Sequence, residues 1–343
     1  MEGNGGPTGF DDRLHRASAW AWLLGLAALA AVVILAVRKF DPVQLARSLA
    51  RADARWLAVA VALQALTYLA QGEVWRGVAG AAGLRLPLAR AYALSLVKLF
   101  VDQTLPSAGV SGTIVAARAL ERRGLPRPAV VACVSVNLVS YYFAYGLALA
   151  GAAAAALARG HRGSRLLAAA GVFVVVGAGI VGVFLAAARG DRVDGRALSW
   201  PRRLAAYFKQ ADPELLRSPR LLARCGLMQL AIIAADAATV WALIRSLHIQ
   251  AAPVRVYDSF MLSSVFRSIG FSPGGLGAFE ASSVVTLKRA GVPLPVALSA
   301  TLAFRALSFW LPMLPGLWLS RRELRAAPSP APSSSGTGRS APA

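Results

Sequence analysis

The sequence predicts an all-α, polytopic membrane protein, and its composition, its hydropathy and a repeated helix break all indicate this class. Hydrophobic residues make up 57% of the 343-residue chain, and the mean hydropathy is +0.55. Charged residues contribute 15%, whereas an average soluble domain carries about 25%. Several apolar runs reach the roughly 20 residues that a helix needs to cross a bilayer.

A hydrophobic segment broken by proline and glycine occurs twice, and the two copies lie 167 positions apart. The first copy, LPSAGVSG, centres on Pro106, and the second, SPGGLG, centres on Pro273. Related endings follow at the same spacing, RRGLPRP up to Pro128 and RAGVPLP up to Pro295, which favours a true repeat over chance. Paired broken helices in corresponding halves of a membrane protein point to a transport site.

Six full spans are predicted beside the two broken segments. The spans cover residues 18–37, 56–75, 129–157, 165–188, 221–247 and 296–319. The broken segments have arms at 88–105 and 108–120, and at 257–271 and 275–289, which are either re-entrant or fully spanning. Three full spans separate the breaks and each break adds an even number of crossings, so the second copy should be inverted, as in many secondary transporters.

The predicted domain organisation is a disordered lead at 1–13, a transmembrane domain at 14–325 and a disordered Pro/Ser/Ala-rich tail at 326–343. The first apolar run is longer than the apolar region of a signal peptide, so we expect a retained helix. The segment 41–55 is predicted to be an amphipathic helix at the membrane interface. The basic loop at 189–224 and the arginines after residue 320 should face the cytoplasm, which predicts a multi-pass protein of the cell membrane.

Several function classes are not expected. The formal charge of +21 lies in short clusters between apolar runs, without the aromatic-interleaved groove of a nucleic-acid binder. The sequence has no GK[ST] loop, HExxH or GxSxG motif, so we expect no enzyme activity. Cys133 and Cys225 should be buried hydrophobes, and neither a metal nor a cofactor is predicted. An intramembrane enzyme built on Glu73, Asp102 or Asp236 is the alternative.

Charged residues inside apolar segments are the main site candidates, because each costs about 2.5–3.5 kcal/mol to insert at the centre of a span. They are Glu73, Lys98, Asp102, Asp236, Arg267, Glu280 and Arg305, joined by the polar Asn137. Arg305 should find a carboxylate partner, and Glu280 is the nearest in sequence. A buried structural ion pair and a site for a headgroup or coupling ion are both open interpretations of that pair.

The second break has the composition of an anion site. Pro273 lacks a backbone donor, and Gly274, Gly275 and Gly277 permit an open backbone that exposes N–H groups at the start of a helix. Such helix starts favour anions, including phosphate. Arg267 or Arg305 would add positive charge, whereas the carboxylate of Glu280 would compete unless it is protonated or paired.

The stretch from 266 to 319 resembles the lysylphosphatidylglycerol synthase transmembrane region, a family also called flippase-like. The matching positions are Pro273, Gly274, Gly275, Gly277, Glu280, Gly291 and Arg305. The first break resembles the family's first broken region through Pro106, Gly109, Gly112 and Gly124. The resemblance extends over 18–322 and implies the membrane part of such proteins. Lysyl transfer to lipid is not expected, because no aminoacyl-transfer domain follows.

The resemblance also shows a departure, because Asn137 lies in a helix where the family commonly carries an acidic–arginine pair. We therefore expect the second break to dominate the site. The predicted function is to translocate or bind a phospholipid, expected to be anionic, or a lipid-linked amphiphile. The predicted substrate-binding residues are Pro106, Gly109, Asp102, Pro273, Gly274, Gly275, Gly277, Glu280, Arg267 and Arg305. An ion-coupled small-solute transporter, or a non-transporting partner that docks anionic lipid or an enzyme through its basic loop, are the alternatives.

Overall fold

The computed structural model describes residues 52–104, 110–160, 210–269 and 273–325, together with positions 168, 171 and 179. Every regular element in this part is helical, which confirms the predicted fold class. Among the described residues, four helices are long and apolar enough to cross a membrane: α3 (Ala54–Ala81), α6 (Arg127–Ala158), α10 (Pro219–Ser246) and the helix Leu294–Ser320. The predicted span at 18–37, the 1–13 lead, residues 41–51 and the 326–343 tail lie outside the described residues, as does the predicted span at 165–188 apart from the three single positions.

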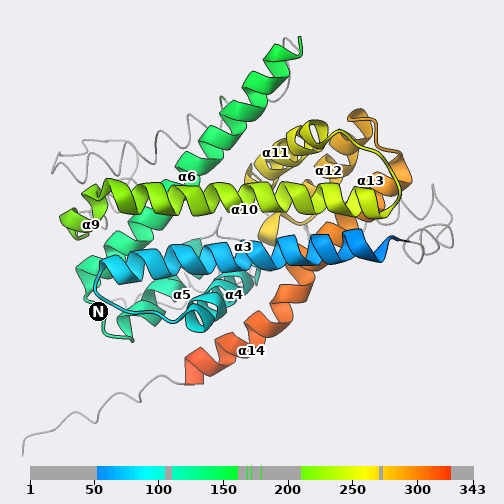
Figure 1. The fold of residues 1–343 in the computed structure, drawn as a ribbon. Coiled ribbons are helices and arrows are strands. Elements are labelled where there is room, and N and C mark those ends of the chain that lie inside the picture. Colours follow the sequence, from blue (N-terminus) through cyan, green and yellow to red (C-terminus); the bar gives the residue numbers. More distant parts are fainter. Residues whose placement is uncertain are drawn as a thin grey trace, which may run out of the picture.

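The helices form two halves with the same order, and the first three helices of each half match in length (Figure 1). In the first half α3 is followed by α4 (Leu88–Thr104), α5 (Val110–Glu121) and α6; in the second, α10 is followed by α11 (Pro253–Ile269), α12 (Ala278–Arg289) and α13 (Leu294–Arg305). Helices α3 and α10 each have 28 residues, α4 and α11 each have 17, and α5 and α12 each have 12. The structure therefore confirms the repeat.

The second half is inverted relative to the first. Helices α3 and α10 lie side by side and run in opposite directions (Figure 1). At one end the Asp53 N–H donates to the Ser246 carbonyl at 2.8 Å. At the other end Glu73, near the end of α3, forms an ion pair of 3.2 Å with Arg224, near the start of α10. Corresponding helices thus cross in opposite senses, as the span count predicted.

Local sequence signals account for the helix starts. The Asp53 side chain accepts from the Arg55 N–H at 2.8 Å, so α3 begins two residues before the predicted span. Ser218 accepts from the Leu221 N–H in the same way before α10. Proline occupies the first turn of α10, where its missing N–H costs nothing.

The broken segments are helical hairpins rather than pairs of spans. Their 17- and 12-residue arms extend about 25 and 18 Å at 1.5 Å per residue, less than the roughly 30 Å of a bilayer core. In the first hairpin, the Gly112 N–H of α5 donates to Asp102 Oδ1 of α4 at 2.7 Å. Arms of these lengths are typical of re-entrant hairpins, which enter and leave a membrane on the same side.

Close packing of the first hairpin depends on Gly112, because a Cβ at this position would collide with the Lys98 carbonyl and the Asp102 carboxylate. We expect Gly112→Ala to lower the free energy of unfolding in lipid nanodiscs by about 1–3 kcal/mol, the usual cost of overpacking. Gly146→Ala is the matched control, because nothing lies within 4 Å of its added Cβ. Equal stability of the two variants would contradict this packing.

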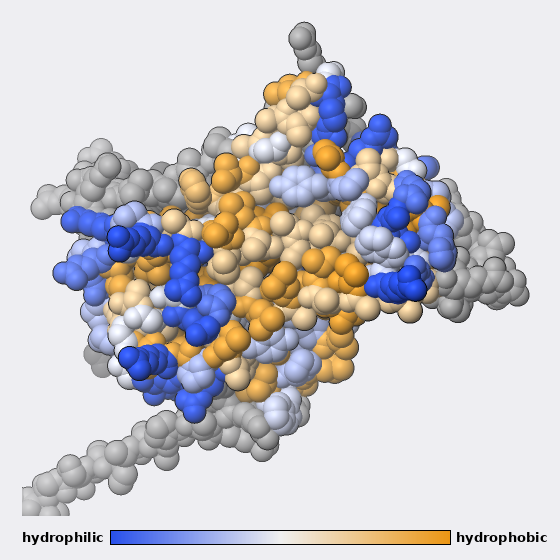
Figure 2. Space-filling view, in the orientation of Figure 1, coloured by the Kyte–Doolittle hydropathy of each residue, from blue (hydrophilic) through white to orange (hydrophobic). Residues whose placement is uncertain are grey.

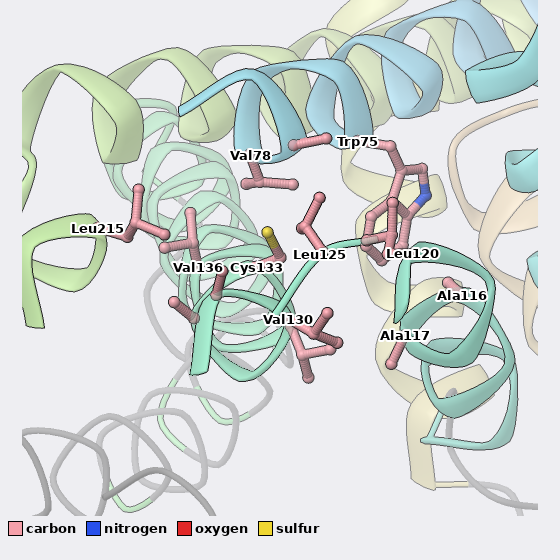
Figure 3. Packing of buried hydrophobic residues seen from close by; sticks show 14 of the residues in the cluster. Trp75, Val78, Ala116, Ala117, Leu120, Leu125, Val130, Cys133, Val136 and Leu215 are labelled. Atoms are coloured by element: carbon pink, nitrogen blue, oxygen red, sulfur yellow. The ribbon is translucent and has the colours of Figure 1, made fainter. Parts of the chain in front are cut away.

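One apolar core holds together the end of the molecule where α3 finishes and α10 begins. Figure 3 shows Trp75 and Val78 of α3 facing Leu120 of α5 and Cys133 of α6, with Leu215 beside them. Leu215 belongs to the short helix α9 (Pro213–Arg217), whose N-cap Asp212 donates its backbone N–H to the Pro128 carbonyl at 3.1 Å. Cys133 and Cys225 are both buried in this core, as predicted.

The surface has the pattern of a membrane-spanning protein. Figure 2 shows an apolar band across the middle of the visible face, with hydrophilic residues gathered at both ends. Large apolar side chains are exposed on the long helices, including Leu66, Phe143, Leu227, Leu314 and Trp318. Such a band is matched to hydrocarbon rather than to water.

Candidate functional site

The end of α4, in the first hairpin, meets the break of the second hairpin in the interior of the molecule. The first hairpin enters from the end where α3 finishes, and the second enters from the opposite end. A Cβ placed on Gly274, in the second break, would lie 3.4 Å from Cγ of Gln103 in the last turn of α4. Pro106 and Gly109, which belong to the first tip, lie outside the described residues.

The second break has a backbone that requires glycine. It begins with the short 3-10 turn η1 (Pro273–Gly275). Gly274, Gly275 and Gly277 have φ angles of 58°, 67° and 82°, in the left-handed region that residues with a Cβ rarely adopt. A side chain at Gly274 would also collide with the ring of Phe309. The predicted open backbone is therefore present, and it is tightly packed.

The predicted partnership between Glu280 and Arg305 is confirmed. The Arg305 Nε donates to Glu280 Oε1, and the two side chains are 5% and 1% exposed. The other Glu280 oxygen accepts from the Gly277 N–H at 2.6 Å, and Arg305 Nη2 donates to the Gly274 carbonyl at 3.1 Å. The pair thus holds both sides of the break, and Glu280 occupies the helix start where an external anion was expected.

Aromatic rings enclose the Arg305 guanidinium. Its Cζ lies 5.4 Å from the ring centroid of Phe279 and 4.6 Å from that of Phe309. Both rings belong to fully buried side chains. Cation–π contacts and the ion pair therefore fix this arginine from several directions.

Arg267, at the end of α11, has a different environment. Its Nη2 donates to the Tyr145 hydroxyl of α6 at 2.9 Å, and its Cζ lies 5.9 Å from the Phe279 ring. The Asp236 carboxylate of α10 is close enough to interact with its charge, yet Arg267 forms no ion pair with any residue that the structure describes. Arg267 therefore offers its guanidinium to a ligand more readily than Arg305 does.

The remaining predicted charges are held within the helices. Asp102 pairs with Lys98 at 2.6 Å, so its carboxylate is used inside the first hairpin. Glu73 pairs with Arg76 and Arg224 at the end of the span rather than at its centre. Neither carboxylate forms an ion pair with Arg267.

Asn137 has a structural role that the sequence did not reveal. Its Oδ1 accepts from Gln71 Nε2 of α3 at 3.4 Å and from Gln229 Nε2 of α10 at 3.3 Å. The amide thus joins α3, α6 and α10 by hydrogen bonds of the kind that hold membrane helices together.

A π-helical segment after Arg305 is also unforeseen in the sequence. Residues Ala306–Trp310 form this segment (η2), and the Leu311 N–H donates to the Ala306 carbonyl five residues earlier. Pro312 follows and has no N–H, so carbonyls in the preceding turn lose their helical donor. Helix α14 (Leu311–Arg325) then continues. Such π-bulges occur frequently at functional sites.

Side chains of the first half satisfy the freed carbonyls. The Tyr68 hydroxyl of α3 donates to the Leu307 carbonyl at 3.1 Å, and Gln103 Nε2 of α4 donates to the Ser308 carbonyl at 3.2 Å. These bonds attach the break region of one half to spans of the other. Pro312 is the sequence signal for a helix irregularity here, but it does not predict which side chains donate to the freed carbonyls.

These features define a class: a multi-pass membrane protein with inverted halves, whose two helical hairpins meet around buried charge. Secondary transporters place their sites at such broken helices. The chain belongs to the family of the lysylphosphatidylglycerol synthase TM region, whose model matches residues 22–316. This confirms the family resemblance. A search of curated proteins found no match.

Proposed function

We propose that the protein translocates an anionic phospholipid, or a related lipid-linked amphiphile, between the leaflets of the cell membrane, without a chemical step. The observation that carries the proposal is Arg267, which lies where the hairpins meet and has a tyrosine hydroxyl as its hydrogen-bond partner. Arginine binds phosphate through paired, charge-assisted hydrogen bonds. A headgroup phosphate is thus the ligand that this guanidinium suits.

The depth of Arg267 supports a transport site rather than a surface binding site. It contacts Tyr145, which lies near the middle of the 32-residue helix α6. A charge at this depth is costly, and ionisable groups there mark substrate or ion pathways by default. Because the hairpins enter from opposite sides, a headgroup from either leaflet can approach the same arginine while its acyl chains stay in the apolar band.

In this proposal the second break is the frame of the site. A Cβ on Gly275 would overlap Cγ of Arg267, so the backbone of the break lies directly against this side chain. Glu280 and Arg305 hold that backbone in place through their hydrogen bonds with the Gly277 N–H and the Gly274 carbonyl. Pro273, Gly274 and Gly277 shape it, and we assign Pro106, Gly109 and Asp102 to the opposing tip.

Lipid flip-flop in proteoliposomes tests the function. Fluorescent phosphatidylglycerol is compared with phosphatidylcholine by dithionite quenching, for wild type, Arg267→Gln and the control Arg255→Gln. Arg255 lies at the exposed start of the same helix. We expect the wild type to move phosphatidylglycerol faster, and Arg267→Gln to slow it by about tenfold or more, since a hydrogen bond to a charged group is worth about 1.5–3 kcal/mol.

Two results would contradict the proposal. Wild-type protein at the protein-free background would remove the flippase function altogether. Equal slowing by Arg267→Gln and Arg255→Gln would mean that Arg267 acts only through the general positive charge of the protein.

A further inference from the structure

A second carboxylate shares the interior with Arg267 and has no part in holding the break. Asp236 lies on α10, eighteenth of 28 residues, and accepts from Gln64 Nε2 of α3 at 3.3 Å. Helix α11 packs against α10, and Arg267 of α11 acts on the charge of Asp236 without forming an ion pair with it. Burial disfavours the negative charge of Asp236, and the charge of Arg267 and the hydrogen bond from Gln64 both favour it.

Gln64 is suited to a neighbour that changes its protonation state. It is 4% exposed, and its Nε2 also donates to Thr67 Oγ1 at 3.0 Å. Its Oε1 is buried and has no hydrogen-bond partner. An amide can donate to a carboxylate through nitrogen or, after a flip of the side chain, accept from a carboxylic acid through oxygen. The unpartnered oxygen is the acceptor that a protonated Asp236 requires.

The charge balance of the site changes when an anion arrives. Without ligand, Asp236 and Arg267 offset each other across the low-dielectric interior. A phosphate on Arg267 takes over the compensating charge, and Asp236 then lies beside a second anion. Two like charges in a shared site favour protonation of one of them.

We propose that Asp236 binds a proton when an anionic headgroup occupies Arg267, so that lipid movement is coupled to the proton gradient. This inference rests on the proposed function. In the step, a proton from water forms an O–H bond on the Asp236 carboxylate, while the headgroup phosphate replaces Asp236 as the counter-charge of Arg267. No covalent bond breaks in the lipid, and the site gains one lipid charge and one proton together.

The other ionisable groups near Asp236 and Arg267 are tyrosines, an arginine and a carboxylate that is already paired, so Asp236 is the expected proton acceptor. Helix α3 contributes the Tyr68 hydroxyl, which donates to the Leu307 carbonyl. Helix α6 contributes Tyr145, whose hydroxyl accepts from Arg267, and Tyr141, which acts on the charge of Arg267. On α13 the charged side chain is Arg305, whose carboxylate partner Glu280 is already engaged. Arg267 itself comes from α11.

Proton uptake on lipid binding tests the inference directly. Dioctanoyl phosphatidylglycerol is added to purified protein in weakly buffered detergent at neutral pH, with a pH-indicator dye for protons and calorimetry for binding. We expect wild type and the control Glu214→Gln to take up about one proton per bound lipid by linkage. Asp236→Asn should bind the lipid and take up none. Glu214 is an exposed carboxylate at the start of α9.

The outcomes distinguish a failure of proton coupling from a failure of the proposed lipid function. Lipid binding without proton uptake by wild type would overturn the coupling and leave the headgroup site standing. Uptake that persists in Asp236→Asn would also overturn it, because another group would then hold the proton. An absence of binding in wild type would overturn the proposed function itself.

Discussion

Glu280→Ala is expected to destabilise the protein by about 3–5 kcal/mol, because it leaves the buried charge of Arg305 without its partner. The same change frees the Gly277 N–H, which now donates to Glu280 Oε2 at 2.6 Å. The break would then lose the hydrogen-bond acceptor of Gly277 and the carboxylate that holds Arg305. Equilibrium unfolding in mixed micelles measures the effect as a change in the free energy of unfolding.

Two further variants identify the buried charge as the cause. The double variant Glu280→Gln/Arg305→Met removes both charges and should recover much of the lost stability. Glu73→Gln is the matched control, because the Glu73 side chain is 26% exposed and its pairs are near the surface. It should cost no more than about 1 kcal/mol. A Glu280→Ala protein as stable as Glu73→Gln would contradict the structural role of the pair.

Gly275→Ala should abolish lipid movement without changing any charge. The residue has a φ of 67°, and an added Cβ would overlap Cγ of Arg267 and lie 3.0 Å from its Cα. Because the second contact is with backbone, relief requires a shift of α11 or of the break. We expect a loss of about 1–3 kcal/mol from overpacking alone, with further loss from the left-handed conformation.

Flip-flop rates normalised to folded protein separate the local effect from misfolding. Gly80→Ala is the control, since Gly80 lies in α3 with nothing within 4 Å of an added Cβ. It should match the wild type in rate and equal or exceed it in stability. Wild-type transport by Gly275→Ala would show that the position of Arg267 against the break is irrelevant to function.

The features that sequence reasoning predicted correctly have strong local causes. Proline and glycine at fixed spacing mark the breaks at Gly274 and Gly275, because few other residues adopt that backbone. The pairing of Arg305 with Glu280 follows from the cost of an unpaired charge in a span. Inversion followed from counting spans, and the antiparallel α3 and α10 agree with it.

The contacts between the halves could not be predicted in the same way. Tyr145 on Arg267 and Gln103 on the Ser308 carbonyl join residues that are more than a hundred positions apart. Hydropathy and spacing carry no signal for such a pairing. The role of Asn137 as a bridge between α3 and α10 likewise required the three-dimensional arrangement.

The central claim is that an anionic headgroup occupies Arg267, and native mass spectrometry of lipids retained through gentle purification tests it most directly. Wild type and Arg255→Gln should retain phospholipid enriched in one anionic headgroup, and Arg267→Gln should lose this enrichment. Retained lipid that mirrors the bulk membrane in wild type, or an anionic enrichment that survives in Arg267→Gln, would contradict the account.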